Sequence, residues 1–191
     1  MSEDSTTRIE AGSLLVATPT LLDPNFDHAV VLMLDVDENG ALGVVLNRPS
    51  TVEVGEILPE WSGVGRGPHV LFSGGPVSTD SALAVAALPS VVDDEPVGFR
   101  RLYAEVGIVD LDTPTEVVGP ALSGLRIFAG YAGWREAQLV DEIRAGSWYV
   151  VPSQPGDVFG TDPTTLWMRV LRRQPGELAW VSTRPLDPSL N

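Results

Sequence analysis

Residues 128–152 have the sequence Phe128-Ala-Gly-Tyr-Ala-Gly-Trp-Arg-Glu-Ala-Gln-Leu-Val-Asp-Glu-Ile-Arg-Ala-Gly-Ser-Trp-Tyr-Val-Val-Pro152, and this stretch decides the fold. Its pattern predicts the end of a buried strand, a glycine turn, an amphipathic helix and a second buried strand. The first strand covers Leu125 to Ala129. Gly130 and Gly133 are placed in the turn, because glycine allows positive φ and a close approach of the backbone.

The helix in this stretch is expected from about Trp134 to Ala145, with Gly146 just past its C-terminus. At about 100° per residue, one face of the helix is apolar and faces the core. Glu136 falls on this apolar side, in the first turn, where the helix dipole tolerates a carboxylate. The apolar positions are Leu139, Val140 and Ile143, and those expected to face solvent are Arg135, Gln138, Asp141 and Glu142.

The rest of the chain contains short apolar runs separated by glycine, proline and polar turns. Asn39-Gly40 between two such runs is a strong hairpin signal. Short helices are expected from Ser50 or Thr51 to about Leu58, within 113–122 and from Pro163 onward, and a last strand within 177–182. No regular βαβ repeat is present, so the pattern favours an α+β fold with a mainly antiparallel sheet. We expect one domain over residues 1–191, with flexible termini at 1–8 and 185–191.

Composition excludes several kinds of chemistry. Twelve basic and 26 acidic residues give a net charge of −14, which disfavours direct contact with nucleic acid. The chain has no cysteine and its basic residues are all arginines, so thiol catalysis, Schiff-base chemistry and a P-loop lysine are excluded. It shows neither a secretory pattern nor an apolar run of membrane length, and we expect a cytoplasmic protein without membrane contact.

Two motifs that suggest a metal or a catalytic triad are incomplete. Asp35-x-Asp37-x-Asn39-Gly40 resembles the start of a calcium loop, but Leu46 occupies the position of the bidentate glutamate. A Ser-His-Asp triad would need His28 or His69, and Gly-x-Ser-x-Gly is absent. We therefore expect a hairpin turn at residues 37–40, and neither a metal nor a cofactor.

Four segments, taken together, resemble one known family. They are Gly12-Ser-Leu-Leu-Val-Ala-Thr-Pro-Thr-Leu-Leu-Asp-Pro-Asn-Phe26, Gly43-Val-Val-Leu-Asn-Arg-Pro49, Gly74-Gly-Pro-Val77 and Phe128-Ala-Gly-Tyr-Ala-Gly-Trp134. In this order and spacing they resemble the AlgH/YqgE family of small bacterial proteins, over about Gly12 to Arg173. The resemblance implies a branched β-sheet rolled into a pseudo-barrel with a few flanking helices, and no established activity. The chain departs from the family at Ala137-Gln-Leu-Val140, where Gly-Gln-Leu-Glu is usual.

The glycine turns suggest a candidate site, because backbone amides at strand ends and helix starts can hold small anionic groups. The alternative is that both turns are only bends between elements. The first hypothesis is a non-enzymatic domain that binds a small molecule or a protein partner. The others are a carboxylate-dependent hydrolase that uses Glu136, and a transcriptional regulator that acts through a protein partner. The residues expected at the site are Arg48, Gly74, Gly75, Gly130, Tyr131, Gly133, Trp134 and Glu136.

Overall fold

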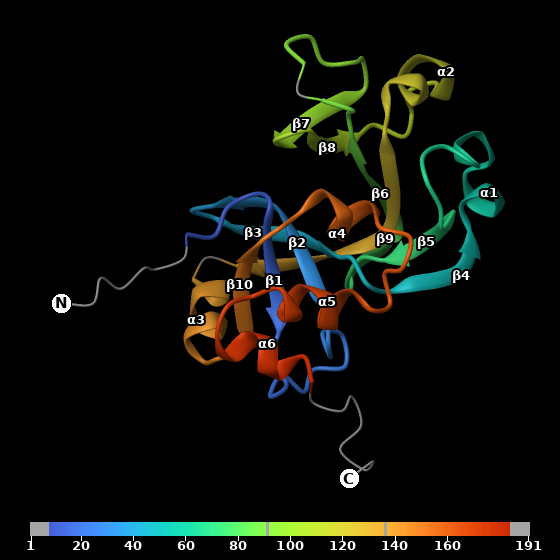
Figure 1. Cartoon of the computed structure of the whole chain (residues 1–191). Coiled ribbons are helices and arrows are strands. Elements are labelled where there is room, and N and C mark those ends of the chain that lie inside the picture. Colours follow the sequence, from blue (N-terminus) through green and yellow to red (C-terminus); the bar gives the residue numbers. More distant parts are fainter. Residues whose placement is uncertain (1–7, 91, 136, 184–191) are drawn as a thin grey trace.

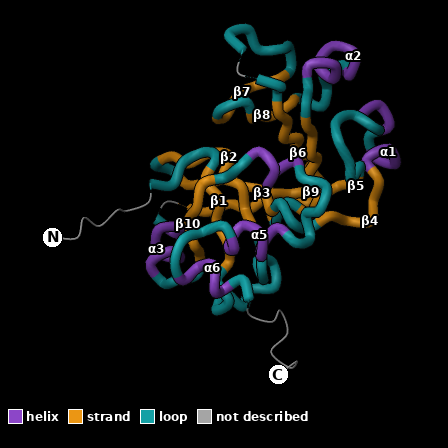
Figure 2. The backbone as a smooth tube through the Cα atoms, in the orientation of Figure 1, coloured by secondary structure: helices purple, strands orange, loops and turns teal. Residues whose placement is uncertain are grey.

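The computed structural model describes residues 8–90, 92–135 and 137–183. Within them, ten strands form one sheet that curls into a half-barrel flanked by short helices (Figures 1 and 2). The strands are β1 (Ser13–Ala17), β2 (Val30–Asp37), β3 (Gly40–Val45), β4 (Pro49–Glu53), β5 (Val70–Ser73), β6 (Val77–Ala87), β7 (Phe99–Tyr103), β8 (Val106–Val109), β9 (Gly124–Arg135) and β10 (Trp148–Pro152).

The strand order confirms the predicted α+β class and its branched sheet. The main path is β10-β1-β2-β3-β9-β6-β8-β7, and β5 leaves this path to pair with β4 and β9. Only the β5–β9 pairing is parallel among the described strands. The hairpin expected at residues 37–40 joins β2 to β3, where Asp37 pairs with Gly40.

The helices are short, and none of those in the described ranges is long and apolar enough to cross a membrane. Figure 1 shows α1, α2, β7 and β8 at one end of the molecule and α3 and α6 at the other, with α5 between these ends. The helical segments are α1 (Val54–Ile57), η1 (Pro59–Trp61), α2 (Thr115–Val118), η2 (Gly119–Ala121), α3 (Gln138–Arg144), α4 (Pro155–Phe159), α5 (Leu166–Arg172) and α6 (Glu177–Val181).

The central stretch differs from its prediction in the length of β9 and in one side of the helix, where Val140, expected to face the core, is 41% exposed. Strand β9 does not end at Ala129 but continues through the two glycines to Arg135. Its last four residues pair with β3, where Gly40 lies opposite Arg135 and Gly43 opposite Ala132. This pairing fixes Trp134 in a strand, so the helix begins only at Gln138, after Ala137 in the left-handed region at φ 61°. Gly146 follows the helix at φ +80°, as predicted.

Two other elements were predicted wrongly. Residues 49–53 form strand β4 against β5, because Pro49 and Glu53 pair with Phe72 and Val70, and the following helix therefore starts at Val54. Residues 177–181 form helix α6 instead of a strand, and this helix packs against α5. For β4, pairing with a strand later in the chain overrides local preference, whereas α6 packs on the helix just before it.

The core contains three clusters of buried side chains, and β9 contributes to each of them. Leu125 and Ile127 belong to the cluster around Trp61. Phe128 belongs to the large cluster between the sheet and α5. Ala132 and Trp134 belong to the cluster around Trp148. One twelve-residue strand thus links every part of the described core.

Candidate functional site

Gly74 and Gly75 lie against Gly130 and Tyr131 of β9 at the point where the sheet branches. The Gly74 N–H donates to the Ala129 carbonyl, and the Val45 N–H donates to the Gly74 carbonyl, both at 2.9 Å. A Cβ on Gly74 or Gly75 would fall within 3 Å of the backbone at Gly130 or Tyr131. We call Gly74, Gly75, Gly130 and Tyr131 the strand junction. Its glycines permit close packing of backbones, and the hypothesis that it also binds a ligand stays a prediction.

The other candidate residues in the described ranges make separate contacts. The Arg48 carbonyl accepts the Ser73 N–H beside the junction, but its guanidinium donates to the carbonyls of Pro24 (3.2 Å) and Asp27 (2.9 Å). Arg48 therefore holds the loop between β1 and β2. Gly133 is exposed, opposite Leu42 on β3.

Trp134 lies in a cluster of aromatic side chains, where it stacks on Phe26 and meets the edge of Trp148. Both indole N–H groups donate to Glu142 Oε2, at 2.9 Å from Trp134 and 2.8 Å from Trp148. Glu142 was expected to face solvent, and its half-buried position is a correction. Glu136, the proposed catalytic acid, lies outside the described residues.

Arg126 is a buried cation that the sequence analysis did not single out. Its side chain is 3% exposed, and its guanidinium donates to the carbonyls of Arg66, Gly67, Pro68 and Gly160. Burial lowers its pKa to about 10, so it keeps its charge at neutral pH. Arg126 thus fastens the loop before β5 to the end of α4, which is a structural role.

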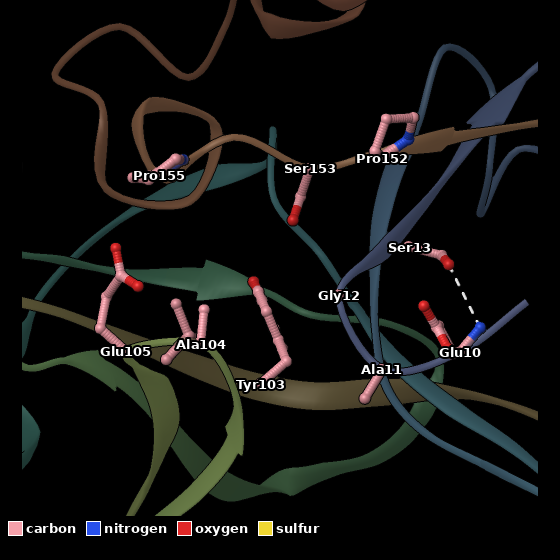
Figure 3. Close-up of a pocket in the computed structure, with 11 residues that line it drawn as sticks. Glu10, Ala11, Gly12, Ser13, Tyr103, Ala104, Glu105, Pro152, Ser153 and Pro155 are labelled. Carbon is pink, nitrogen blue, oxygen red and sulfur yellow. Dashed lines mark hydrogen bonds between the residues drawn. The ribbon is translucent and has the colours of Figure 1, made fainter. Parts of the chain in front are cut away.

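A pocket of about 360 Å³ lies where three segments distant in sequence meet. They are the start of β1, the turn between β7 and β8, and the residues after β10 (Figure 3). We call it the Tyr103 pocket. Its lining residues are Glu10, Ala11, Gly12, Ser13, Tyr103, Ala104, Glu105, Val106, Pro152, Ser153 and Pro155.

Gly12 leaves the space that the Tyr103 ring occupies beside this pocket. Gly12 has φ +91°, and a Cβ there would lie 2.8 Å from the Tyr103 ring. The Gly12 carbonyl also accepts the Ser153 N–H at 3.2 Å, which brings the third segment to the pocket. Gly12 opens the first of the segments that resemble the family, but its place in the sequence did not indicate a pocket.

The Tyr103 hydroxyl is buried and has no hydrogen-bond partner among the residues that the structure describes. Figure 3 shows it and the Ser153 side chain pointing toward each other across the pocket. Burial raises the pKa of Tyr103, and the charges of Asp157 and Glu105 raise it further. The neighbouring Ser153 hydroxyl opposes this rise. Tyr103 is therefore a neutral hydrogen-bond donor.

The charged residues that line the pocket are both glutamates, Glu10 and Glu105. Arg173 lies behind the pocket wall, where it donates to the Pro152 carbonyl at 3.2 Å. Its charge is matched by the buried Asp157, to which it makes two hydrogen bonds of 2.6 Å. Among the described residues, no group of three or more His, Asp or Glu side chains could hold a metal ion.

Comparison with known proteins agrees with this architecture, a curled antiparallel sheet with flanking helices. The AlgH-like family model matches residues 14–179, and the chain belongs to this family. A UPF0301 protein of Streptomyces coelicolor is 58% identical over 182 residues, and one of Thermobifida fusca is 52% identical over 191 residues. Each of these alignments covers 94% of both chains.

Two solved structures share the fold. The crystal structure of a Corynebacterium diphtheriae protein superposes with a TM-score of 0.87 at 35% identity and covers 93% of both chains. The solution structure of AlgH from Pseudomonas aeruginosa gives a TM-score of 0.66 at 25% identity. That match covers 97% of this chain and 98% of AlgH. The names of these relatives state no activity.

Proposed function

We propose that this protein is a small-ligand-binding domain and that the Tyr103 pocket is its binding site. One observation carries the proposal: three segments distant in sequence enclose a pocket whose lining combines apolar side chains with the polar side chains of Glu10, Tyr103, Glu105 and Ser153. The pocket volume is also within the range of small-molecule sites.

The geometry supports binding more than catalysis. The hydrolase hypothesis depended on Glu136, which lies outside the described residues. The two glutamates of the Tyr103 pocket, Glu10 and Glu105, belong to segments on opposite sides of it (Figure 3). Neither has an assigned hydrogen bond that would orient its carboxylate for proton transfer.

The test is a thermal-shift screen of the purified protein against metabolites, nucleotides and metal ions. A ligand at a hundred times its Kd adds about 2.7 kcal/mol of stability, which raises the melting temperature by several degrees. Every hit is then measured again on Ser153→Leu. Ser153 is half-buried, and leucine at this position fills part of the pocket while its backbone N–H keeps the bond to Gly12.

We expect Ser153→Leu to abolish the shift, and Ser90→Leu, at an exposed serine that does not line the pocket, to retain it. Hits that Ser153→Leu leaves unchanged bind elsewhere and would contradict the proposed site. A screen without hits would contradict the proposed function and turn the search toward a protein partner.

A further inference from the structure

We propose that one end of the molecule, formed by α1, η1, α2 and residues 92–98, is a docking surface for a basic amphipathic segment of another protein. We call it the α1–α2 surface. It shares no residue with the Tyr103 pocket, so this inference is independent of the proposed function. It combines two observations: exposed aliphatic side chains and acidic side chains without a partner of opposite charge.

Four aliphatic side chains at this end of the molecule are exposed to solvent. Ile57 on α1 is 59% exposed, Val117 on α2 is 53% exposed, and Val97 in the loop before β7 is 74% exposed. Val92 in the same loop is also exposed. These four are half of the large hydrophobic side chains that are exposed in the described ranges. Single exposed hydrophobic residues are normal, whereas a group of them at one end is typical of an interaction site.

The two helices of this surface are fixed to one part of the core. Val54 of α1 and Val118 of α2 are buried in the same cluster, together with Trp61 of η1. The Trp61 indole N–H donates to the Leu111 carbonyl at 3.2 Å, which ties η1 to the segment before α2. The exposed sides of α1 and α2 therefore keep a fixed position relative to each other.

The loop that carries Val97 belongs to the same surface. A Cβ on the next residue, Gly98, would lie within 3 Å of the Thr113 side chain, so this loop contacts the residues just before α2. Figure 1 shows α2 between this loop and α1. The exposed aliphatic side chains thus come from three neighbouring elements.

The charged side chains around these aliphatic ones are acidic. Segments 49–65 and 110–125 contain six acidic residues and neither arginine nor histidine. All six are exposed, and none of them has an ion pair among the residues that the structure describes. They are Glu53, Glu56, Glu60, Asp110, Asp112 and Glu116.

This combination decides which kind of partner fits. Phosphates of nucleic acids and anionic lipid headgroups would be repelled by the carboxylates. A second copy of the chain would bring the same acidic surface against this one. A protein segment in which lysines or arginines alternate with apolar side chains meets both features. Its apolar side chains would cover the aliphatic ones, and its cations would face the carboxylates.

The test uses two short synthetic amphipathic helices as probes. One consists of leucine and lysine, and the other has glutamate in place of every lysine. Binding is followed by amide chemical shifts in NMR titrations of the full chain at pH 7. We expect the lysine peptide to shift the amides of residues 54–61, 92–98 and 111–118. We expect the glutamate peptide to bind more weakly by about tenfold or more.

One pair of double variants tests the aliphatic side chains. Ile57→Ser/Val117→Ser should lower the affinity for the lysine peptide by about tenfold, because less apolar surface is buried on binding. Leu22→Ser/Val140→Ser changes two exposed side chains in the loop after β1 and on α3, and should leave the affinity unchanged.

A second pair tests whether the position of the charges matters. Glu60→Gln/Glu116→Gln removes two carboxylates of the surface and should weaken binding of the lysine peptide. Glu38→Gln/Glu177→Gln removes two exposed carboxylates between β2 and β3 and on α6, changes the net charge equally, and should weaken binding less.

Several outcomes would overturn the proposal. Equal losses in a test variant and its control would show attraction to the general charge of −14 and not to this surface. Equal binding of the glutamate peptide, shifts gathered in other elements, or no shifts at all would exclude a basic partner. Shifts of the same amides on concentrating the protein alone would assign the surface to a second copy of the chain.

Discussion

At the scale of single residues, Gly130 shows how a missing side chain permits the branch in the sheet. Gly130 has φ +74°, and a Cβ there would lie 2.6 Å from the Gly75 carbonyl oxygen and 2.9 Å from that of Val77. The left-handed backbone costs alanine about 1–2 kcal/mol, and the two carbonyls must also move. We therefore predict that Gly130→Ala lowers the free energy of unfolding by about 2–4 kcal/mol. Urea unfolding followed by far-UV circular dichroism measures it.

Gly156→Ala is the matched control, because a Cβ at Gly156 would meet nothing within 4 Å. This glycine lies in α4, where alanine is the better helix former, so stability should stay the same or rise slightly. If Gly130→Ala is as stable as the natural chain, the branch tolerates a side chain and the packing explanation of its glycines is wrong.

At the scale of elements, Glu142 connects helix α3 to strands β9 and β10. Its Oε2 accepts both the Trp134 and the Trp148 indole N–H, and its Oε1 accepts the Gln138 amide at 2.9 Å. Glu142→Ala leaves two indole donors without their acceptor, and we predict a loss of about 2–4 kcal/mol of stability. Asp141→Ala, on the exposed side of the same helix, should cost almost nothing, because its pair with Arg144 is a 3.8 Å surface contact. Equal urea midpoints for the two variants would contradict this role of Glu142.

The sequence predicts an element well when contacts between residues close in the chain determine it, and poorly when the deciding contacts join distant residues. The hairpin at Asn39-Gly40 and the end of α3 at Gly146 follow from local turn chemistry, and both predictions are confirmed. The extension of β9 through Trp134 depends on pairing with β3, about 90 residues earlier, which no local pattern reveals. The Tyr103 pocket is further out of reach, because its lining comes from three segments that only the folded chain brings together.

At the scale of the whole molecule, β9 joins the three core clusters, so no cluster can unfold without losing part of its contacts to this strand. Leu125 and Ile127 pack in the first cluster, Phe128 in the second, and Ala132 and Trp134 in the third. The Arg126 side chain, on the same strand, holds two further loops through their carbonyls. This arrangement favours cooperative unfolding of the described core. Cooperative unfolding is what the prediction of a single domain requires.

We predict that urea unfolds all three clusters in one transition, because each of them contains side chains of β9. The five tryptophans allow a direct test by fluorine NMR after labelling with 5-fluorotryptophan. Trp61, Trp167 and Trp148 each report on a different cluster, and their native signals should vanish with the same midpoint. Trp180 is 77% exposed on α6 and serves as the reference for a site outside these clusters. If the Trp61 signal is lost at a lower urea concentration than the others, the end with β7, β8 and α2 is a separate unit. The chain would then have two domains that share one strand.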